Sequence, residues 1–266
     1  MDFQSYPNLL VSIEERVATV TLNRPEQLNT TTAMLGELER IWGDLEGEHE
    51  VDLVILTGAG KAFSAGGDIR AMADRYGTPE GLRHNILTTQ SARRLIDSIL
   101  NLSKPLICAI NGDAAGLGAT LALLSDITVM ADTARLGDPH VRVGLVAGDG
   151  GAVIWPLLIG PSRAKEFLMR GALVAAPDAL RMGLVNHVVA RDEVLQKASE
   201  LAQEILRNPV WAVRWTKQSV NKWLKQQVEL IFDASIAFEM LSAFSADHGE
   251  ATKAATEKRA PIYTGF

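Results

Sequence analysis

The chain contains a single cysteine, Cys108, within 266 residues. One thiol cannot form an internal disulfide, which excludes a disulfide-stapled scaffold and indicates a reducing compartment such as the cytoplasm. Cys108 lies in the apolar run 106–110, where a buried and inert thiol is expected. The sequence therefore predicts neither a disulfide framework nor a cysteine nucleophile.

Long apolar runs, a basic excess and metal-ligand spacings are also missing. No run is long enough to cross a membrane, and the first residues lack the basic and apolar regions of a secretion signal. The formal net charge of −6 argues against nucleic acid as the main partner, although a local positive patch on an acidic protein can still bind an anionic small molecule. The five histidines are scattered without a cysteine or carboxylate partner at ligand spacing, so no metal site is expected.

Short apolar segments alternate with helical ones in the first part of the chain. Strands are expected at 8–13, 16–22, 51–57, 105–110 and 127–131, and helices at 31–45, 83–102 and 116–124, the first capped by its threonine run. Strands covered on both faces predict an α/β architecture with parallel pairing. Helical periodicity then continues through 192–206, 210–224, 228–244 and 251–258. We predict an α/β core over 1–195 and a helical region over 196–266.

Two glycine-rich turns, at 60–69 and 111–119, each join a strand to a helix through small residues. Small residues allow a ligand to lie against the main chain, and free N–H groups at a helix start favour negative charge. Asp68 is placed to cap the helix after the first turn. Either turn alone is equally compatible with a tight turn without a ligand, and neither has the spacing of a P-loop or a dinucleotide fingerprint.

Together, in this order and about fifty residues apart, the turns resemble those of the crotonase (enoyl-CoA hydratase/isomerase) superfamily. The resemblance extends over nearly the whole chain, through the segments 22–25, 62–69, 110–118, 124–127, 144–151, 171–188, 208–209 and 216–221. It implies a spiral of ββα units followed by helices, assembled as a homotrimer or a dimer of trimers. It also implies an acyl-CoA substrate, with coenzyme A as part of that substrate and no tightly bound cofactor.

The resemblance further implies positions for the binding groups. The N–H groups of Gly67 and Leu117 would form an oxyanion hole for the thioester oxygen, where each donor contributes about 3 kcal/mol to stabilising an enolate. Contacts to coenzyme A would come mostly from the backbone around Gln27, Leu28, Ala62, Ser64, Gly66, Asp68 and Ile69. Many members have Lys or Arg where this chain has Gln27, so one phosphate contact would be missing.

The acid–base residues differ from those of the hydratases, which use two glutamates to activate water. This chain has Thr120 and His140 at the matching positions. Thr120 is expected to face a pocket from a helix interior. His140 titrates near neutrality and suits proton transfer, and Asp149 could orient it or accept a proton itself. Alternatively, His140 is a hydrogen-bonded loop residue and Asp149 is the N-cap of the following helix.

A narrower resemblance involves residues 138–140, 148–150 and 155–156, which are similar to the oxocamphor hydrolase branch of the superfamily. That branch cleaves a carbon–carbon bond of β-diketones with a histidine, an aspartate and a glutamate on a C-terminal helix. Here these would be His140, Asp149 and Glu239, although Glu239 could equally be a solvated charge on its helix. The Ala-Gly-Gly-Asp of this chain is absent from the oxyanion turn of that branch.

Three hypotheses about function follow. The first is an enzyme of the enoyl-CoA hydratase/isomerase type, a lyase or isomerase of the kind used in fatty acid metabolism, with His140 and Asp149 moving protons. The second is a retro-Claisen hydrolase of a cyclic β-keto-acyl-CoA or a β-diketone. The third is a non-catalytic acyl-CoA binder or an RNA binder, and the acidic balance counts against RNA. The remaining histidines, His49, His187 and His248, are expected to be solvated, and His84 begins a helix that shapes acyl pockets in the family.

Overall fold

The computed structural model describes residues 3–265 and contains two sheets. The larger sheet has the order β1-β2-β3-β5-β7-β10, in which β1 and β2 are antiparallel and every other neighbouring pair is parallel. Its strands are β1 (Leu9–Glu14), β2 (Val17–Leu22), β3 (Leu53–Gly58), β5 (Leu106–Ile110), β7 (Ile127–Ala131) and β10 (His187–Val189). Every residue of β3 and β5 is buried, as expected for parallel strands covered on both faces.

A smaller, four-stranded sheet positions the turns, and the sequence did not predict it. Its order is β4 (Ala62–Ser64), β6 (Asp113–Ala115), β8 (Arg135–Gly137) and β9 (Leu173–Ala175), with β4, β6 and β8 parallel. Strands of three residues are too short to show an alternating pattern. Because parallel strands end at the same edge, Gly67, Leu117 and His140, which follow these three strands, come to one edge of the small sheet.

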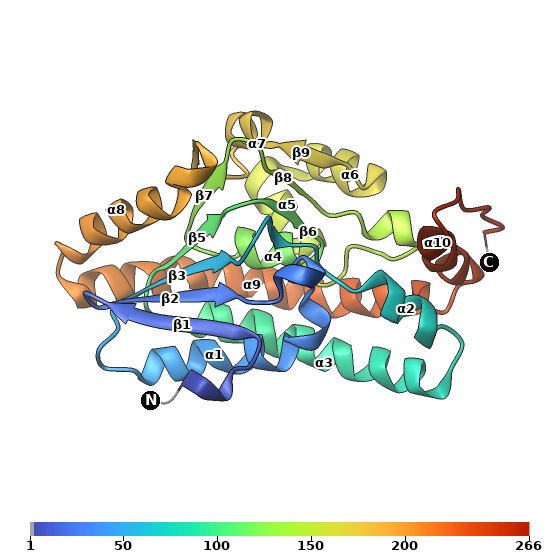
Figure 1. Cartoon of the computed structure of the whole chain (residues 1–266), viewed down its shortest axis with the longest axis horizontal. Coiled ribbons are helices and arrows are strands. Elements are labelled where there is room, and N and C mark those ends of the chain that lie inside the picture. The colour runs from blue at the N-terminus through green and yellow to red at the C-terminus, as the bar shows by residue number, and fades with distance from the viewer. Residues whose placement is uncertain (1–2, 266) are drawn as a thin grey trace.

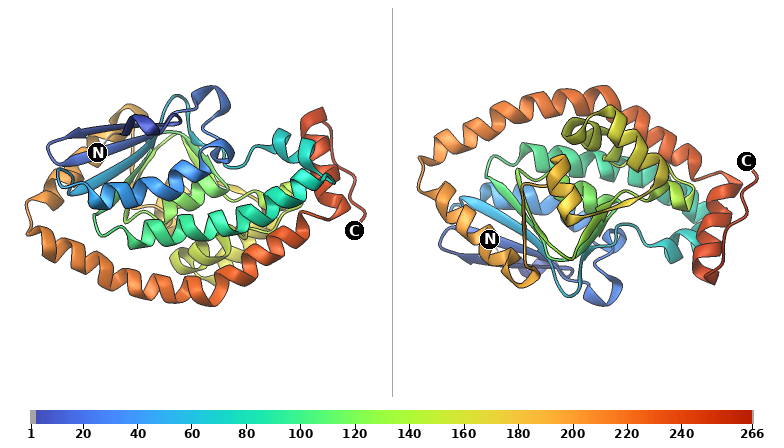
Figure 2. Two further views of the ribbon diagram at one scale, coloured as in Figure 1. Left: turned by 90° about the horizontal axis from the view of Figure 1, so that it is seen from below. Right: turned by 90° about the horizontal axis from the view of Figure 1, so that it is seen from above.

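Helices surround both sheets (Figure 1). They are α1 (Leu35–Gly47), α2 (Ile69–Arg75), α3 (Pro79–Asn101), α4 (Leu117–Leu123), α5 (Gly151–Ile159), α6 (Pro161–Arg170), α7 (Ala176–Met182), α8 (Val194–Leu206), α9 (Val210–Ser242) and α10 (Ala246–Glu257). Short 3₁₀ helices lie at Phe3–Ser5, Pro25–Gln27, Thr31–Ala33, His140–Val143 and Arg191–Glu193. The long α9 packs along α3 and leads to α10, which lies against α2 at one end of the molecule (Figure 2). Within residues 3–265, no helix combines the length and apolar character needed to cross a bilayer.

The fold class is the α/β spiral expected from the sequence, and three local predictions are corrected. The threonine run forms its own 3₁₀ turn at Thr31–Ala33, and α1 begins at Leu35 without a side-chain cap. The segments 210–224 and 228–244 belong to a single helix, because Lys225, Gln226 and Gln227 between them favour helix and contain no breaker. The helix expected at 251–258 begins five residues earlier, at Ala246, where Ser245 provides the N-cap.

Candidate active site

Two backbone N–H groups are free at the carboxyl edge of the small sheet. Within residues 3–265, the amides of Gly67 and Leu117 have no hydrogen-bond acceptor, and both residues line one cavity. The peptide groups around Gly67 are fixed, since the carbonyl of Gly66 accepts from the Thr31 amide at 2.8 Å and the Asp68 amide donates to Thr32 Oγ1 at 3.0 Å. The two N–H groups are therefore held in place and available to an anion.

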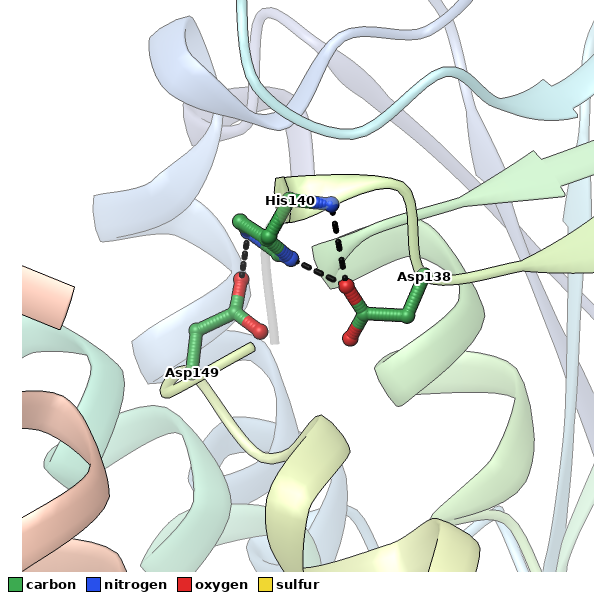
Figure 3. A group of neighbouring side chains, drawn as sticks. All are labelled: Asp138, His140 and Asp149. Atoms are coloured by element: carbon green, nitrogen blue, oxygen red, sulfur yellow. Dashed lines mark hydrogen bonds and ion pairs between the residues drawn. The ribbon is translucent and has the colours of Figure 1, made fainter. Parts of the chain in front are cut away.

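His140 lies between two aspartates (Figure 3). Its Nδ1 is hydrogen-bonded to Asp138 Oδ1, and its Nε2 lies 3.4 Å from Asp149 Oδ2. The imidazole also lies against the second turn, because a Cβ added to Gly116 would be 3.3 Å from its Cε1. Burial disfavours the charged ring, but Asp138 and Asp149 outweigh it and raise the pKa of His140 well above its usual range. The imidazole is thus held both by carboxylates and beside the Leu117 amide.

Asp138 was quoted in the sequence motif but not predicted as a site residue. It is 2% exposed, and its second oxygen, Oδ2, has no hydrogen-bond partner among the described residues. A Cβ on Gly151 would lie 2.0 Å from this oxygen, so the glycine at the start of α5 makes room for the carboxylate. The Asp-Pro-His spacing was the available signal, because a carboxylate two residues before a histidine can orient its ring.

Asp149 reaches the site, and its alternative role as a helix N-cap is wrong. The helix α5 begins at Gly151 with Gly150 as its N-cap and no side-chain cap. The Oδ1 atom of Asp149 is buried without a partner in the described part of the chain. Asp149 therefore offers a free acceptor beside the imidazole of His140.

Glu239 also reaches the site, which contradicts the alternative of a solvated helix charge. It is 6% exposed on α9, and its Oε2 has no partner within the described residues. Gly148 admits it, because a Cβ there would lie 2.8 Å from Oε2. Burial, followed by repulsion from Asp149, raises the pKa of Glu239 to about 8. Asp138, His140, Asp149 and Glu239 are referred to below as the acid–base cluster.

A cavity of about 500 Å³ connects these groups. Gly67, Leu117, His140, Asp149 and Glu239 all lie on its wall. Its other walls come from α2, α3, the end of α9 and His248 of α10. The structure therefore brings together all five residues predicted for catalysis and for the oxyanion hole.

Two further residues, Thr120 and His248, differ from expectation. Thr120 is buried in α4 against Gly150 and does not line the cavity. His248 was expected to be solvated but is 5% exposed on the cavity wall, with its Nδ1 at 2.6 Å from the Val143 carbonyl. His84 lines the cavity too. By contrast, His49 is exposed as expected, and His187 is half-buried in β10.

The residues predicted to bind coenzyme A lie outside this cavity but close to one another. Leu28 accepts a backbone hydrogen bond from Ala65, and Ser64 Oγ donates to the Asn29 carbonyl at 2.7 Å. The buried side-chain amide of Asn29 donates to the carbonyls of Ala59, Ala62 and Phe63, a role that the sequence analysis missed. The side chains of the remaining predicted positions are engaged or exposed: Gln27 accepts from Arg24, Asp68 caps α2 as predicted, and Ile69 is exposed.

The acid–base cluster also has the composition of a metal site, since ligand atoms of Asp138, His140 and Asp149 lie within 4.8 Å of one another. The premise that no histidine has a carboxylate partner is therefore wrong for His140. A metal-bound histidine uses one ring nitrogen for the ion and the other for an outer acceptor. Here the two carboxylates face opposite ring nitrogens, so the geometry is that of a hydrogen-bonded chain.

Comparison with known proteins identifies the family of enzymes to which the chain is similar. A family model described as enoyl-CoA hydratase/isomerase matches residues 12–265. A short-chain-enoyl-CoA hydratase of Clostridium acetobutylicum is 38% identical over 258 residues, 95% of each chain. The crystal structure of an enoyl-CoA hydratase/isomerase from Mycobacterium paratuberculosis is similar at 34% identity and a TM-score of 0.87, covering 92% of this chain and 97% of that one.

A different activity is represented among the similar structures. A β-diketone hydrolase of the cyanobacterium Anabaena, bound to (S)-3-oxocyclohexyl acetic acid, is 26% identical with a TM-score of 0.83, covering 91% of this chain and 96% of that one. The fold is thus that of the crotonases. The chain belongs to the enoyl-CoA hydratase/isomerase family and is an enzyme of that family.

Proposed function

We propose that the protein acts on an acyl-CoA thioester, holds the thioester oxygen between the N–H groups of Gly67 and Leu117, and adds water at the β-carbon. The observation that carries this proposal is the position of these two unpartnered amides on the same cavity wall as His140. Two preorganised donors stabilise an enolate oxygen by about 3 kcal/mol each. The family membership supports the thioester substrate.

The acid–base cluster supplies the proton transfers of this hydration. The water oxygen bonds to the β-carbon, and its proton passes to the unprotonated form of His140, which the raised pKa makes the minor form near neutral pH. The electron pair of the double bond moves to the thioester oxygen. Glu239, protonated near neutrality, gives its proton to the α-carbon as the enolate collapses. Asp138 fixes the ring, and the free oxygen of Asp149 orients the water.

A second candidate is retro-Claisen cleavage, which the Asp138–His140 pair and the likeness to the β-diketone hydrolase favour. The unprotonated form of His140 would take a proton from water as the water oxygen attacks the β-carbonyl. The bond between the α- and β-carbons would then break, with its electron pair moving to the thioester as an enolate. The enolate left behind is the same species that a hydration forms, so the same two amides would stabilise it. The cluster thus fits both reactions. Which one occurs depends on whether the β-carbon of the substrate belongs to a double bond or to a carbonyl group.

Crotonyl-CoA and a cyclic β-keto-acyl-CoA, each followed by mass spectrometry, test the two candidates. Hydration predicts that crotonyl-CoA gains one water while the ring compound stays closed. Ring opening without reaction of crotonyl-CoA would replace the first candidate by the second. Reaction of a free cyclic β-diketone without any binding of coenzyme A esters would overturn the proposal that the substrate is a thioester.

Binding of coenzyme A is proposed for the two adjoining segments around Leu28 and Ser64. Their main chains already lie side by side, since the Ala65 amide donates to the Leu28 carbonyl and Ser64 Oγ donates to the Asn29 carbonyl. Since the nucleotide belongs to the substrate, no separate cofactor is required. Competition by free coenzyme A against the acyl-CoA substrate tests the assignment.

A homotrimer or a dimer of trimers is proposed from the surface of α9. Large apolar side chains are exposed along it, namely Trp211, Trp215, Val220, Trp223, Leu230, Phe238 and Leu241. Exposed aromatic and apolar patches of this kind mark protein interfaces. Sedimentation at micromolar concentration tests the assembly, and a monomer would contradict it. The division at residue 195, the cytoplasmic setting and a role in fatty acid metabolism stay predictions.

A further inference from the structure

The cavity extends beyond the reacting groups to an end formed by α2 and α3. Met72 of α2 lies beside Gly67, because a Cβ on that glycine would be 2.4 Å from its terminal methyl. Arg75, the last residue of α2, lies about 4.5 Å farther along the helix axis, at a rise of about 1.5 Å per residue. Arg75 and the α3 residues His84, Asn85 and Thr88 line this end of the cavity.

Arg75 is a cation without a counter-ion. It is the only lysine or arginine on the cavity wall among residues 3–265, and its guanidinium has neither an ion pair nor a hydrogen bond within that range. Arg93 and Arg94 of α3, by contrast, both pair with carboxylates. The backbone of Arg75 packs against Gly81, where a Cβ would meet its carbonyl oxygen at 2.0 Å, so the residue is fixed at the junction of α2 and α3.

The polar neighbours of Arg75 are neutral. Burial, and then the charge of Arg75, lower the pKa of His84, so its imidazole is uncharged at neutral pH and can donate one hydrogen bond. The side chains of Asn85 and Thr88 offer further donors. One positive charge surrounded by neutral donors suits a carboxylate.

The two ends of the cavity differ in charge. The reacting end carries the carboxylate of Asp149, and its charge would repel an anionic acyl terminus there. The wall also carries apolar side chains, namely Leu35, Met72, Leu82, Met240 and Phe244. An acidic end, a cationic end and apolar wall residues together match an acyl chain with a thioester at one end and an anion at the other.

We propose that the substrate is an acyl-CoA whose acyl chain ends in a carboxylate, which Arg75 binds with His84 as a neighbouring donor. The inference rests on the proposed placement of the thioester between Gly67 and Leu117. In the hydration candidate Arg75 binds the carboxylate of the substrate. In the retro-Claisen candidate it binds the carboxylate that hydrolytic opening of a cyclic β-keto-acyl group leaves at the far end of the product. Arg75 then determines specificity and takes no part in proton transfer.

Binding of saturated acyl-CoA esters tests the inference without requiring turnover. Adipoyl-CoA and suberoyl-CoA are compared by calorimetry with hexanoyl-CoA and octanoyl-CoA, which have the same chain lengths without the carboxylate. Because a hydrogen-bonded ion pair contributes about 1.5–3 kcal/mol, the carboxylate esters should bind roughly 10- to 100-fold more tightly. Arg75→Met should abolish this preference and leave the affinity for hexanoyl-CoA within about threefold, and Arg75→Lys should retain part of it.

Arg70→Met is the matched control, since Arg70 lies exposed on the same helix and outside the cavity. Equal affinity of the wild-type protein for the paired esters would overturn the inference, as would a preference that survives in Arg75→Met. A preference for adipoyl-CoA that depends on Arg75, combined with no turnover of any enoyl or β-keto ester, would instead reject the proposed reaction and leave the substrate class standing.

Discussion

Two groups of charged side chains lie in different parts of this molecule and differ in how many of their polar atoms have hydrogen-bond partners. The acid–base cluster has three buried carboxylate oxygens without a partner among the described residues, on Asp138, Asp149 and Glu239. The second group, the lysine cluster, consists of Lys104, Asp126 and Lys217. Lys217 Nζ donates to Asp126 at 2.7 Å and to the Lys104 carbonyl at 2.8 Å, while Asp126 also accepts from the Leu106 amide.

The lysine cluster joins segments that are distant in sequence. Lys104 Nζ donates to the carbonyls of Leu45 and Glu48 at the end of α1, and Lys217 connects α9 to the segment before β5. Both lysine nitrogens and the Oδ2 atom of Asp126 have partners in the described structure. A buried polar group without a partner costs about 1–3 kcal/mol. Among the described residues, every buried carboxylate oxygen without a partner belongs to the acid–base cluster beside the cavity, which separates a reactive cluster from a structural one.

The largest expected effect is on activity, at His140. His140→Gln should lower kcat on the accepted substrate by roughly 10²- to 10⁴-fold, the usual contribution of a positioned acid–base group. Steady-state kinetics on protein shown by circular dichroism to be folded measures it. His49→Gln, on an exposed histidine, is the control and should retain full activity. A kcat within threefold of wild type in His140→Gln would remove His140 from the chemistry.

How far the sequence predicts this cluster depends on the range of the contacts. The two glycine-rich turns and the Asp68 cap follow from local turn chemistry, because glycine and a carboxylate before a helix specify backbone conformation within a few residues. The roles of Gly67 and Leu117 followed from the resemblance to the family. The pairing of His140 with Asp138 is also local, yet the direction of the ring depends on how the loop after β8 lies on α5. That packing requires a glycine at position 151 to leave space for Asp138, and the spacing of residues within the loop does not predict it.

The burial of Glu239 and His248 at the cavity could not be predicted from their neighbours in the sequence. Each lies on a C-terminal helix about one hundred residues after His140, and which helix face is buried depends on where α9 and α10 pack. The three-residue strands of the small sheet were missed for a related reason, since their length gives no alternating pattern. The larger sheet was predictable, because strands buried on both faces form continuous apolar runs.

The second expected effect is on stability, at Glu239. Its folded-state pKa of about 8 lies above the ordinary value of 4.5, so unfolding releases a proton between these pH values and wild-type stability falls as the pH rises through them. Glu239→Gln cannot ionise. Its free energy of unfolding should therefore exceed that of wild type by an amount that grows from pH 4.5 to pH 8, on the order of 3 kcal/mol.

Urea denaturation at pH 5 and pH 8 measures this difference. Glu204→Gln, at an exposed position of α8, is the control and should show no such growth. If Glu239→Gln and wild type differ by the same free energy at both pH values, the carboxyl group is not held protonated in the folded protein. The kinetics of Glu239→Gln separately report whether proton donation to the α-carbon is lost.

The third expected effect is a loss of stability without a loss of activity, at the lysine cluster. Lys217→Met leaves Asp126 without its ion-pair partner and should lower the free energy of unfolding by roughly 3 kcal/mol, at the low end for a buried pair because a quarter of the Asp126 side chain is exposed. Activity per folded molecule should be unchanged. The double variant Asp126→Asn/Lys217→Met should recover part of the loss. A fall in kcat without a loss of stability would erase the distinction between the two clusters.

The smallest effect tests whether Gly151 positions the acid–base cluster. A methyl group in Gly151→Ala would lie 2.0 Å from Asp138 Oδ2, so the carboxylate must move and the His140 ring must follow it. We expect a stability loss of about 1–3 kcal/mol from overpacking. We also expect a kcat about 10- to 100-fold below wild type, because shifts of about 1 Å at a reacting group cost this much.

Gly43→Ala is the control. Its added methyl on α1 meets nothing within 4 Å, so it should stabilise the protein by about 0.4–1 kcal/mol with unchanged kcat. Unchanged kcat in Gly151→Ala would mean that Asp138 can shift without moving the imidazole, and the orienting role would then pass to Asp149.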